Sequence, residues 1–135
     1  MRTVLLVISL LISAAPQYSL GAEITMAGCN EKTAELNKEL PMALDGVTTW
    51  VNTTCVDQGA GGIQIVYANL ITNGNDITQS NLEILRPSLI DSWCAGPNLI
   101  PILNVVDTIN YQYDFKNGQH IGELTFSKAE CPAKP

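Results

Sequence analysis

The residues that could carry out chemistry in this 135-residue chain are few, and they begin with one histidine, His120. A single histidine cannot build a multi-histidine metal site, and the Gly-x-Ser-x-Gly pattern of a serine nucleophile does not occur. We therefore interpret His120 as a surface or sheet-edge residue. We expect no catalytic residue, no metal site and no cofactor.

Carboxylates offer a second kind of chemistry, because Asp107, Asp114 and Glu123 lie close together in the sequence. Two carboxyl groups can act as acid and base on a glycosidic bond, so a small secreted hydrolase is the alternative function. Thirteen acidic residues in one small chain also produce such neighbours by chance. We favour a protein that is not an enzyme, and a deep pocket that gathered these carboxylates would reverse that preference.

The four cysteines, Cys29, Cys55, Cys94 and Cys131, all lie beyond the first 28 residues. No two of them have the spacing of a zinc site, so two disulfides are the expected chemistry. Of three possible pairings we favour Cys29 with Cys55 and Cys94 with Cys131, because each joins neighbouring elements. The closed loops of 26 and 37 residues would each remove about 3–4 kcal/mol of freedom from the unfolded chain.

The first residues have the pattern of a secretory signal peptide. Arg2 precedes an apolar run that ends at Ala15 and is too short to span a bilayer. Small residues before Ala22 suit cleavage there, so we expect residues 1–21 to be removed. An oxidising compartment, periplasmic or extracellular, follows from export and agrees with the cysteines.

An alternative interpretation treats Met26–Cys29 as a lipobox, with Cys29 acylated and the domain tethered to a membrane. Leucine is preferred where Met26 stands, and Glu23 interrupts an apolar stretch that should continue almost to the cysteine. We therefore expect no lipid anchor at Cys29.

The mature chain is one small acidic domain. Residues 22–131 are enough for one hydrophobic core, and residues 132–135 should form a disordered tail. Without Arg2 the chain has six basic and thirteen acidic residues, a net charge of 6 − 13 = −7. Such a surface repels phosphate, which disfavours nucleic acid and anionic membranes as partners.

The first half of the domain predicts a helix followed by a β-hairpin. Asn30 can cap the helix, and Pro41 ends or kinks it. Residues 47–56 are rich in β-branched side chains, and residues 63–71 follow a glycine-rich turn as the antiparallel partner.

Ser80 and Glu83 form a capping box, which predicts the start of a second helix. Pro87 should bend or split this helix, and Gly96-Pro97 should end it. One face collects an apolar stripe of Leu82, Leu85, Leu89 and Trp93. A further helical turn within residues 97–106 should direct Leu99, Ile102 and Leu103 inward.

Asn117-Gly118 is the preferred pair for a two-residue type I′ turn and lies between two alternating runs. The resulting register also lets the ring of Tyr113 cover Gly122. It pairs Phe115 with His120, Tyr113 with Gly122, Tyr111 with Leu124, and Ile109 with Phe126.

The predicted order is therefore helix, strand, strand, helix, strand, strand. The simplest arrangement is an α+β fold, a four-stranded antiparallel sheet with both helices on one face and a more polar opposite face. On an alternating strand Trp50 points to the side opposite to Val47 and Val51. Either assignment of faces therefore leaves an apolar side chain exposed, unless the strand is buried on both sides. If exposed beside Val56 or Val66, Trp50 would mark a contact surface.

The C-terminal third of the chain also resembles a known group. Leu85-Arg86-Pro87, Cys94, Tyr111-x-Tyr113, Gly118, Ile121-Gly122 and a closing Cys131 resemble small exported bacterial proteins of unknown function. The resemblance implies a bridge between Cys94 and Cys131 and a bacterial envelope setting, but no activity. Our leading hypothesis is an exported, disulfide-stabilised binding module that acts through a protein partner, as an accessory protein or an inhibitor.

Overall fold

The computed structural model describes residues 24–94 and 102–131. The predicted signal peptide, the tail, Gly96-Pro97 and Leu99 lie outside these residues. The helices and strands are α3 (Met26–Asn37), β1 (Met42–Ala43), β2 (Thr48–Asp57), β3 (Ile63–Ile71), α4 (Gln79–Cys94), β4 (Thr108–Phe115) and β5 (His120–Ser127). Short 3-10 turns lie at Gly59–Gly61, Ile102–Asn104 and Lys128–Glu130.

The five strands form one mixed sheet in the order β1-β2-β3-β4-β5. Neighbouring strands are antiparallel except β3 and β4, which are parallel. The prediction of an α+β fold is confirmed, but the prediction of four antiparallel strands is wrong. Helix α4 lies between β3 and β4 in the chain and returns it to the end where β3 began, as a parallel pair requires.

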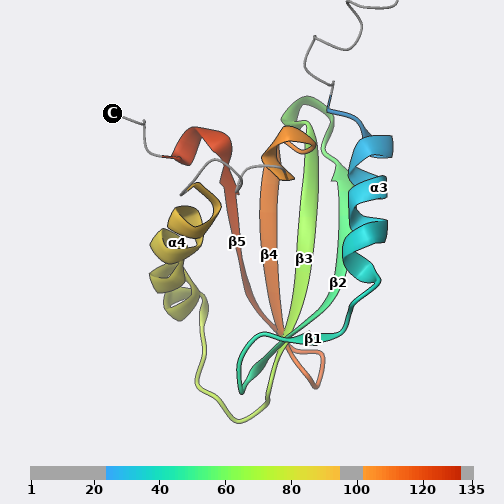
Figure 1. The fold of residues 1–135 in the computed structure, drawn as a ribbon. Coiled ribbons are helices and arrows are strands. Elements are labelled where there is room, and N and C mark those ends of the chain that lie inside the picture. Colours follow the sequence, from blue (N-terminus) through green and yellow to red (C-terminus); the bar gives the residue numbers. More distant parts are fainter. Residues whose placement is uncertain (1–23, 95–101, 132–135) are drawn as a thin grey trace, which may run out of the picture.

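Both helices cover the same face of the sheet. Figure 1 shows α3 beside β2 and α4 beside β5, with β3 and β4 between them. Leu36 of α3 and Trp93 of α4 pack on one core that includes Tyr67 of β3. The opposite face presents polar side chains such as Gln64, Asn110 and Thr125, in line with the expected polar face.

Helix α3 begins earlier than predicted. Thr25 caps it, and the Thr25 side chain accepts a hydrogen bond from the Gly28 N–H at 3.0 Å. Asn30, the predicted cap, therefore lies inside the helix. The earlier start places Cys29 within the first turn of α3, where its side chain is fully excluded from solvent.

Helix α4 also has a different cap. The backbone N–H of Thr78 donates to Asn81 Oδ1 at 2.8 Å, while Ser80 and Glu83, the predicted capping box, lie within the helix. Glu83 instead accepts from Arg86 Nε at 2.8 Å. The helix runs through Pro87 without a break, and Leu85, expected in the apolar stripe, is 46% exposed.

The last hairpin keeps most of the predicted register. Three of the predicted pairs, Tyr113–Gly122, Tyr111–Leu124 and Ile109–Phe126, are confirmed. His120 pairs with Asp114 rather than Phe115, because the register shifts after Tyr113. Asn117 lacks the positive φ of a type I′ turn, and Gly118 alone has it, at +94°. The loop is thus one residue longer than predicted, and the extra residue produces the shift.

Gly122 makes room for a different group from the one predicted. A Cβ atom there would clash with Gln79 Oε1, so the side chain above the glycine is Gln79 rather than Tyr113. Gln79 Nε2 donates to the Glu123 carbonyl, and the Glu123 N–H donates to Gln79 Oε1, both at 2.8 Å. One carboxamide from α4 therefore occupies the open edge of β5.

Candidate functional site

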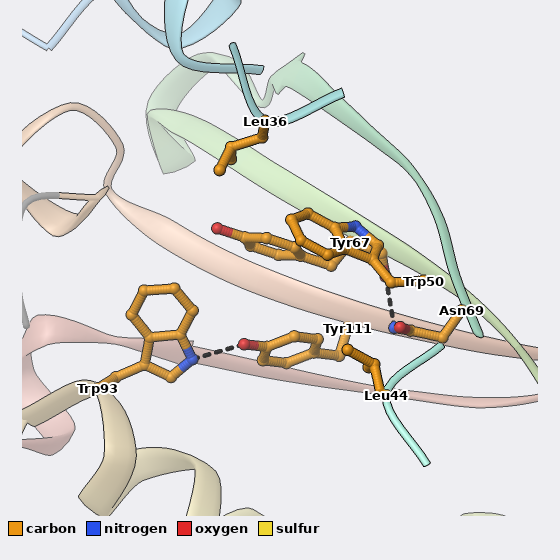
Figure 2. A pocket seen from close by; sticks show the side chains of 7 residues that line it. All are labelled: Leu36, Leu44, Trp50, Tyr67, Asn69, Trp93 and Tyr111. Carbon is orange, nitrogen blue, oxygen red and sulfur yellow. Dashed lines mark hydrogen bonds between the residues drawn. The ribbon is translucent and has the colours of Figure 1, made fainter. Parts of the chain in front are cut away.

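An apolar cavity opens on the helix-covered face of the sheet, between α3 and α4 (Figure 2). Its volume is about 260 Å³. We call it the aromatic cavity, and its lining residues are Leu36, Leu44, Trp50, Tyr67, Asn69, Trp93 and Tyr111.

Adjacent strands bring the aromatic rings together. The parallel register places Tyr67 of β3 beside Tyr111 of β4, with stacked rings 5.1 Å apart. Trp50 of β2 and Trp93 of α4 lie on either side, with ring centroids 5.3 and 5.9 Å from that of Tyr67. Four rings from four elements thus meet at one place, which gives the cavity a preformed aromatic wall.

Both indole N–H groups of the wall already donate hydrogen bonds. Trp93 Nε1 donates to the Tyr111 hydroxyl at 2.6 Å, and Trp50 Nε1 donates to Thr53 Oγ1 at 3.1 Å. Since both indole N–H groups already have acceptors, the wall offers mainly carbon to an occupant. The cavity is therefore suited to an apolar group.

The two tyrosines on the cavity floor are held in the neutral form. Burial raises the pKa of the Tyr67 phenol far above its usual value. Burial, followed by the nearby Tyr67 group, also raises the pKa of Tyr111, although the hydrogen bond from Trp93 opposes this. Both phenols therefore stay protonated near neutral pH.

A second cavity of about 260 Å³ follows on the same face, and we call it the distal cavity. The rings of Tyr111 and Tyr113, one in each cavity floor, lie 6.5 Å apart. Leu44 at the aromatic cavity is 55% exposed, and Leu85 at the distal cavity is 46% exposed. The lining residues of the distal cavity are Asp45, Val47, Thr48, Ile71, Ile77, Asn81, Leu82, Leu85 and Tyr113.

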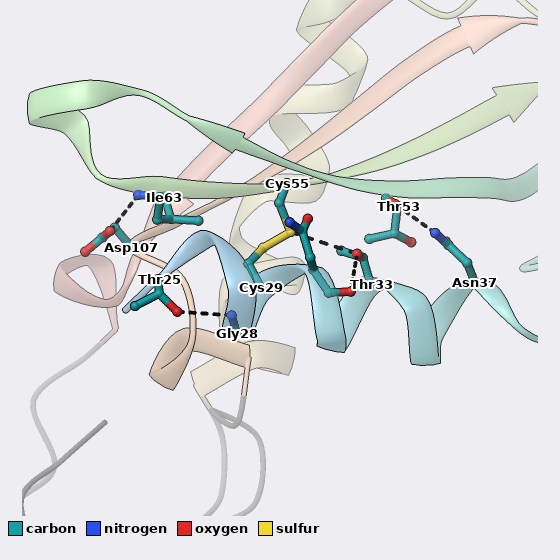
Figure 3. The surroundings of a disulfide bond; sticks show 10 residues. Thr25, Gly28, Cys29, Thr33, Asn37, Thr53, Cys55, Ile63 and Asp107 are labelled. Atoms are coloured by element: carbon teal, nitrogen blue, oxygen red, sulfur yellow. Dashed lines mark hydrogen bonds between the residues drawn. A yellow bond between two sulfur atoms is a disulfide. The ribbon is translucent and has the colours of Figure 1, made fainter. Parts of the chain in front are cut away.

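Both predicted disulfides are present, Cys29–Cys55 and Cys94–Cys131. The first joins α3 to β2 next to the hydrogen bond from Asn37 Nδ2 to the Thr53 carbonyl, at 2.9 Å (Figure 3). The second joins the end of α4 to the segment that follows β5. Each bridge therefore anchors one of the two helices that border the cavities.

The predicted contact residues do not form one patch. Trp50 lines the aromatic cavity, and its ring packs against Tyr67 on the helix-covered face. Val56 and Val66 line a shallow depression on the opposite face, where Val56 is 40% exposed and Val66 only 7%. The structure thus separates Trp50 from the two valines.

The candidate hydrolase carboxylates are not gathered into a pocket. Asp107 Oδ2 accepts from the Ile63 N–H at 2.7 Å, and Asp114 Oδ1 lies 2.7 Å from Nδ1 of the exposed His120. Glu123 lines the shallow depression beside Val56 and Val66, and Asp107 and Asp114 do not. Within residues 24–94 and 102–131, no three histidine, cysteine or acidic residues gather as metal ligands would.

The sequence patterns placed Trp93 in an apolar helix stripe and paired Tyr111 with Leu124, but they did not connect either residue with Tyr67 or Leu44. One signal was available. Residues 63–71 are almost continuously apolar, which is typical of a central strand beside a parallel neighbour. That pairing would have placed Tyr67 next to Tyr111.

Three solved structures share this fold. A protein of Pseudomonas aeruginosa described as secreted matches with a TM-score of 0.65 and 16% identity, over 79% of this chain and 92% of its own. The pilotin EpsS of the Vibrio vulnificus type 2 secretion system has a TM-score of 0.59 and 14% identity, over 82% and 94%.

The type II secretion system pilotin AspS of Vibrio cholerae has a TM-score of 0.55 and 18% identity, over 80% of this chain and 92% of its own. No family model and no curated protein sequence matches the chain. At these identities the likeness establishes a shared fold.

The protein is periplasmic or secreted. Its two disulfides require an oxidising compartment, and the fold neighbours, a protein described as secreted and two secretion-system pilotins, agree with that location. In the part of the chain that the structure describes, no helix has the length and apolar character needed to cross a bilayer.

Proposed function

We propose that the protein is an exported accessory module that binds a protein partner through the aromatic and distal cavities. The observation that carries this proposal is the aromatic cavity, an apolar hollow walled by four rings whose indole N–H groups are already bonded. Aromatic residues in such pockets are typical of protein interface hot spots.

The size of the cavity favours a protein side chain over a cofactor. At about 260 Å³ it is smaller than the roughly 300–1,000 Å³ of small-molecule sites. The distal cavity has the same volume and lies next to it. A protein segment with two apolar anchors, one for each cavity, would fit this arrangement and would cover Leu44 and Leu85.

Fold and charge support the same kind of partner. Two fold neighbours are pilotins of type II secretion systems, so a component of an envelope secretion system is the partner class we propose. The chain is acidic, at −6 overall, so a partner with basic residues beside its apolar anchors would associate faster at low salt. We also propose that the chain belongs among the small exported bacterial proteins that its C-terminal third resembles.

Site-specific cross-linking tests the proposal. A photoreactive residue at the exposed Leu44 should capture one envelope protein in cells that make this chain naturally. The same residue at Ala60, exposed on a turn outside both cavities, is the control and should capture none. Equal capture from both positions, or none from Leu44, would contradict the proposal.

A matched pair of variants then measures the contribution of the cavity. Leu44→Asp should weaken binding of the captured partner about tenfold or more, because it places a charge where an apolar group docks. Ile84→Asp should bind normally, since Ile84 is 74% exposed and lines neither cavity. Both tryptophans of the chain, Trp50 and Trp93, line the aromatic cavity, so intrinsic fluorescence reports its occupancy.

A further inference from the structure

The face of the sheet that carries no helix has a depression of its own. It is about 460 Å³ and shallow, and its lining is dominated by carboxamides. We call it the amide depression. Its polar lining residues are Gln58, Gln64, Asn110, Gln112, Glu123 and Thr125.

Hydrogen bonds hold several of these amides in place. Gln58 Nε2 donates to Gln64 Oε1 at 3.0 Å, and Gln64 Nε2 donates to Thr108 Oγ1 at 3.1 Å. Asn110 Nδ2 donates to Thr125 Oγ1 at 2.7 Å. The donors and acceptors thus have fixed directions before any ligand arrives, which lowers the entropic cost of binding.

One polar atom in this network lacks a partner. Asn110 is only 3% exposed, yet no donor in residues 24–94 or 102–131 bonds its buried Oδ1 atom. A buried amide oxygen without a donor destabilises a fold. The partner of Asn110 on β3 is the apolar Val66, so an apolar residue would also suit this position on that side, and asparagine is better explained by a ligand than by stability.

The lining selects one class of ligand. Among the residues that the structure describes, no lysine, arginine or aromatic side chain lines the depression, and Glu123 together with the acidic chain repels anions. Val56 and Val66 form its apolar part and can contact C–H groups. Fixed amides beside aliphatic carbon suit an uncharged ligand that has many hydroxyl groups and a flat C–H face.

We propose that the amide depression is a saccharide-binding site, in which Gln112, the one carboxamide of the lining outside the hydrogen-bond network above, moves aside and a sugar hydroxyl donates to Asn110 Oδ1. The site goes beyond the proposed partner function, because it lies on the opposite face from the aromatic cavity. Glycans are abundant in the periplasm and outside the cell, where this protein resides.

Titration of the isotope-labelled protein tests the site through its side-chain amide resonances. Chitotetraose and maltotetraose at about 10 mM, a range suited to weak binding, should shift the amides of Gln64, Gln58 and Asn110. A tetramer of galacturonic acid, which is anionic, should not. Shifts with the acid alone, shifts confined to the aromatic cavity, or no shifts at all would overturn the proposal.

The variant Asn110→Val separates binding from folding. It removes the unpartnered oxygen and introduces a β-branched residue into a strand, so the melting temperature should rise while sugar affinity falls about tenfold or more. A lower melting temperature with unchanged affinity would overturn the proposal. Asn52→Val, on β2 and outside the depression, is the matched control and should bind normally.

A second variant keeps the test valid if Asn110→Val does not fold. Gln58 is exposed on the turn after β2, so Gln58→Ala should leave the fold intact and weaken sugar binding by removing one fixed amide. Unchanged affinity in this variant would also contradict the site.

Discussion

At the scale of single residues, the pKa values of the tyrosines reflect their burial between the helices and the sheet. Tyr67, Tyr111 and Tyr113 are the tyrosines of residues 24–94 and 102–131, and burial raises the pKa of all three. For Tyr113 the charge of Asp45 adds to the effect of burial. The folded protein therefore favours the neutral phenol at every one of these positions.

This arrangement predicts how stability depends on pH. Below about pH 10 the phenols are neutral in both folded and unfolded chains, and their contribution is fully present. As pH rises above that value the unfolded chain ionises first, so the free energy of unfolding should fall. Absorbance of tyrosinate should appear together with unfolding, and a tyrosine that titrated near pH 10 in the folded protein would contradict the buried arrangement.

At the scale of elements, polar side chains of α4 occupy the edge of β5 and add to the apolar packing that attaches this helix to the sheet. Gln79 bonds both backbone groups of Glu123, and Arg86 Nη1 donates to the Thr125 carbonyl at 2.7 Å. An open strand edge invites pairing with other chains, so these bonds also protect β5 from aggregation.

Gly122→Ala tests this attachment. The new Cβ atom would displace the Gln79 carboxamide, and loss of its two exposed hydrogen bonds should lower the free energy of unfolding by about 1–2 kcal/mol. Gln79→Ala should have a similar effect. Because both substitutions remove the same contact, the double variant should be little worse than either single one in urea denaturation. Additive losses would show that the two positions act independently.

At the scale of the whole molecule, two covalent bonds hold one helix at each side of the same sheet face. Cys29–Cys55 fixes α3 to β2, and Cys94–Cys131 fixes α4 to the segment after β5. The aromatic cavity lies between these two helices and is lined by Leu36 of α3 and Trp93 of α4. The integrity of the cavity therefore depends on both bridges.

Removal of the first bridge should reduce both stability and cavity binding. In Cys29→Ala/Cys55→Ala the loop of 26 residues opens, and the free energy of unfolding should fall by about 3–4 kcal/mol in the chain-entropy model. Tryptophan fluorescence should also change, since α3 supports the cavity beside Trp50. A loss below about 1 kcal/mol would indicate that packing alone holds α3.

The same covalent bonds bear on the lipid-anchor alternative. A lipid on Cys29 would need the sulfur atom that pairs with Cys55. Absence of the anchor stays a prediction, and mass spectrometry of the mature N-terminus measures it directly.

Local rules determined much of this protein from the sequence alone. Two disulfides, the hairpin of β2 and β3, and three of four pairs in the last hairpin follow from cysteine spacing, β-branched runs and side-chain alternation. Each depends on residues close in the chain or on the two-residue alternation of side chains along a strand. Helix starts were less accurate, because Thr25 and Thr78 could cap as well as Asn30 and Ser80.

Only the tertiary structure decided the parallel pairing of β3 with β4, and with it the candidate site. The strand that follows α4 can pair either with β3 or with another edge of the sheet. The outcome depends on which surface buries the apolar side of α4, and a short stretch of sequence does not contain that information. That choice places Tyr67 beside Tyr111 and aligns Val66 with Asn110 on the opposite face. Both proposed binding surfaces therefore arise from contacts between residues more than 40 positions apart.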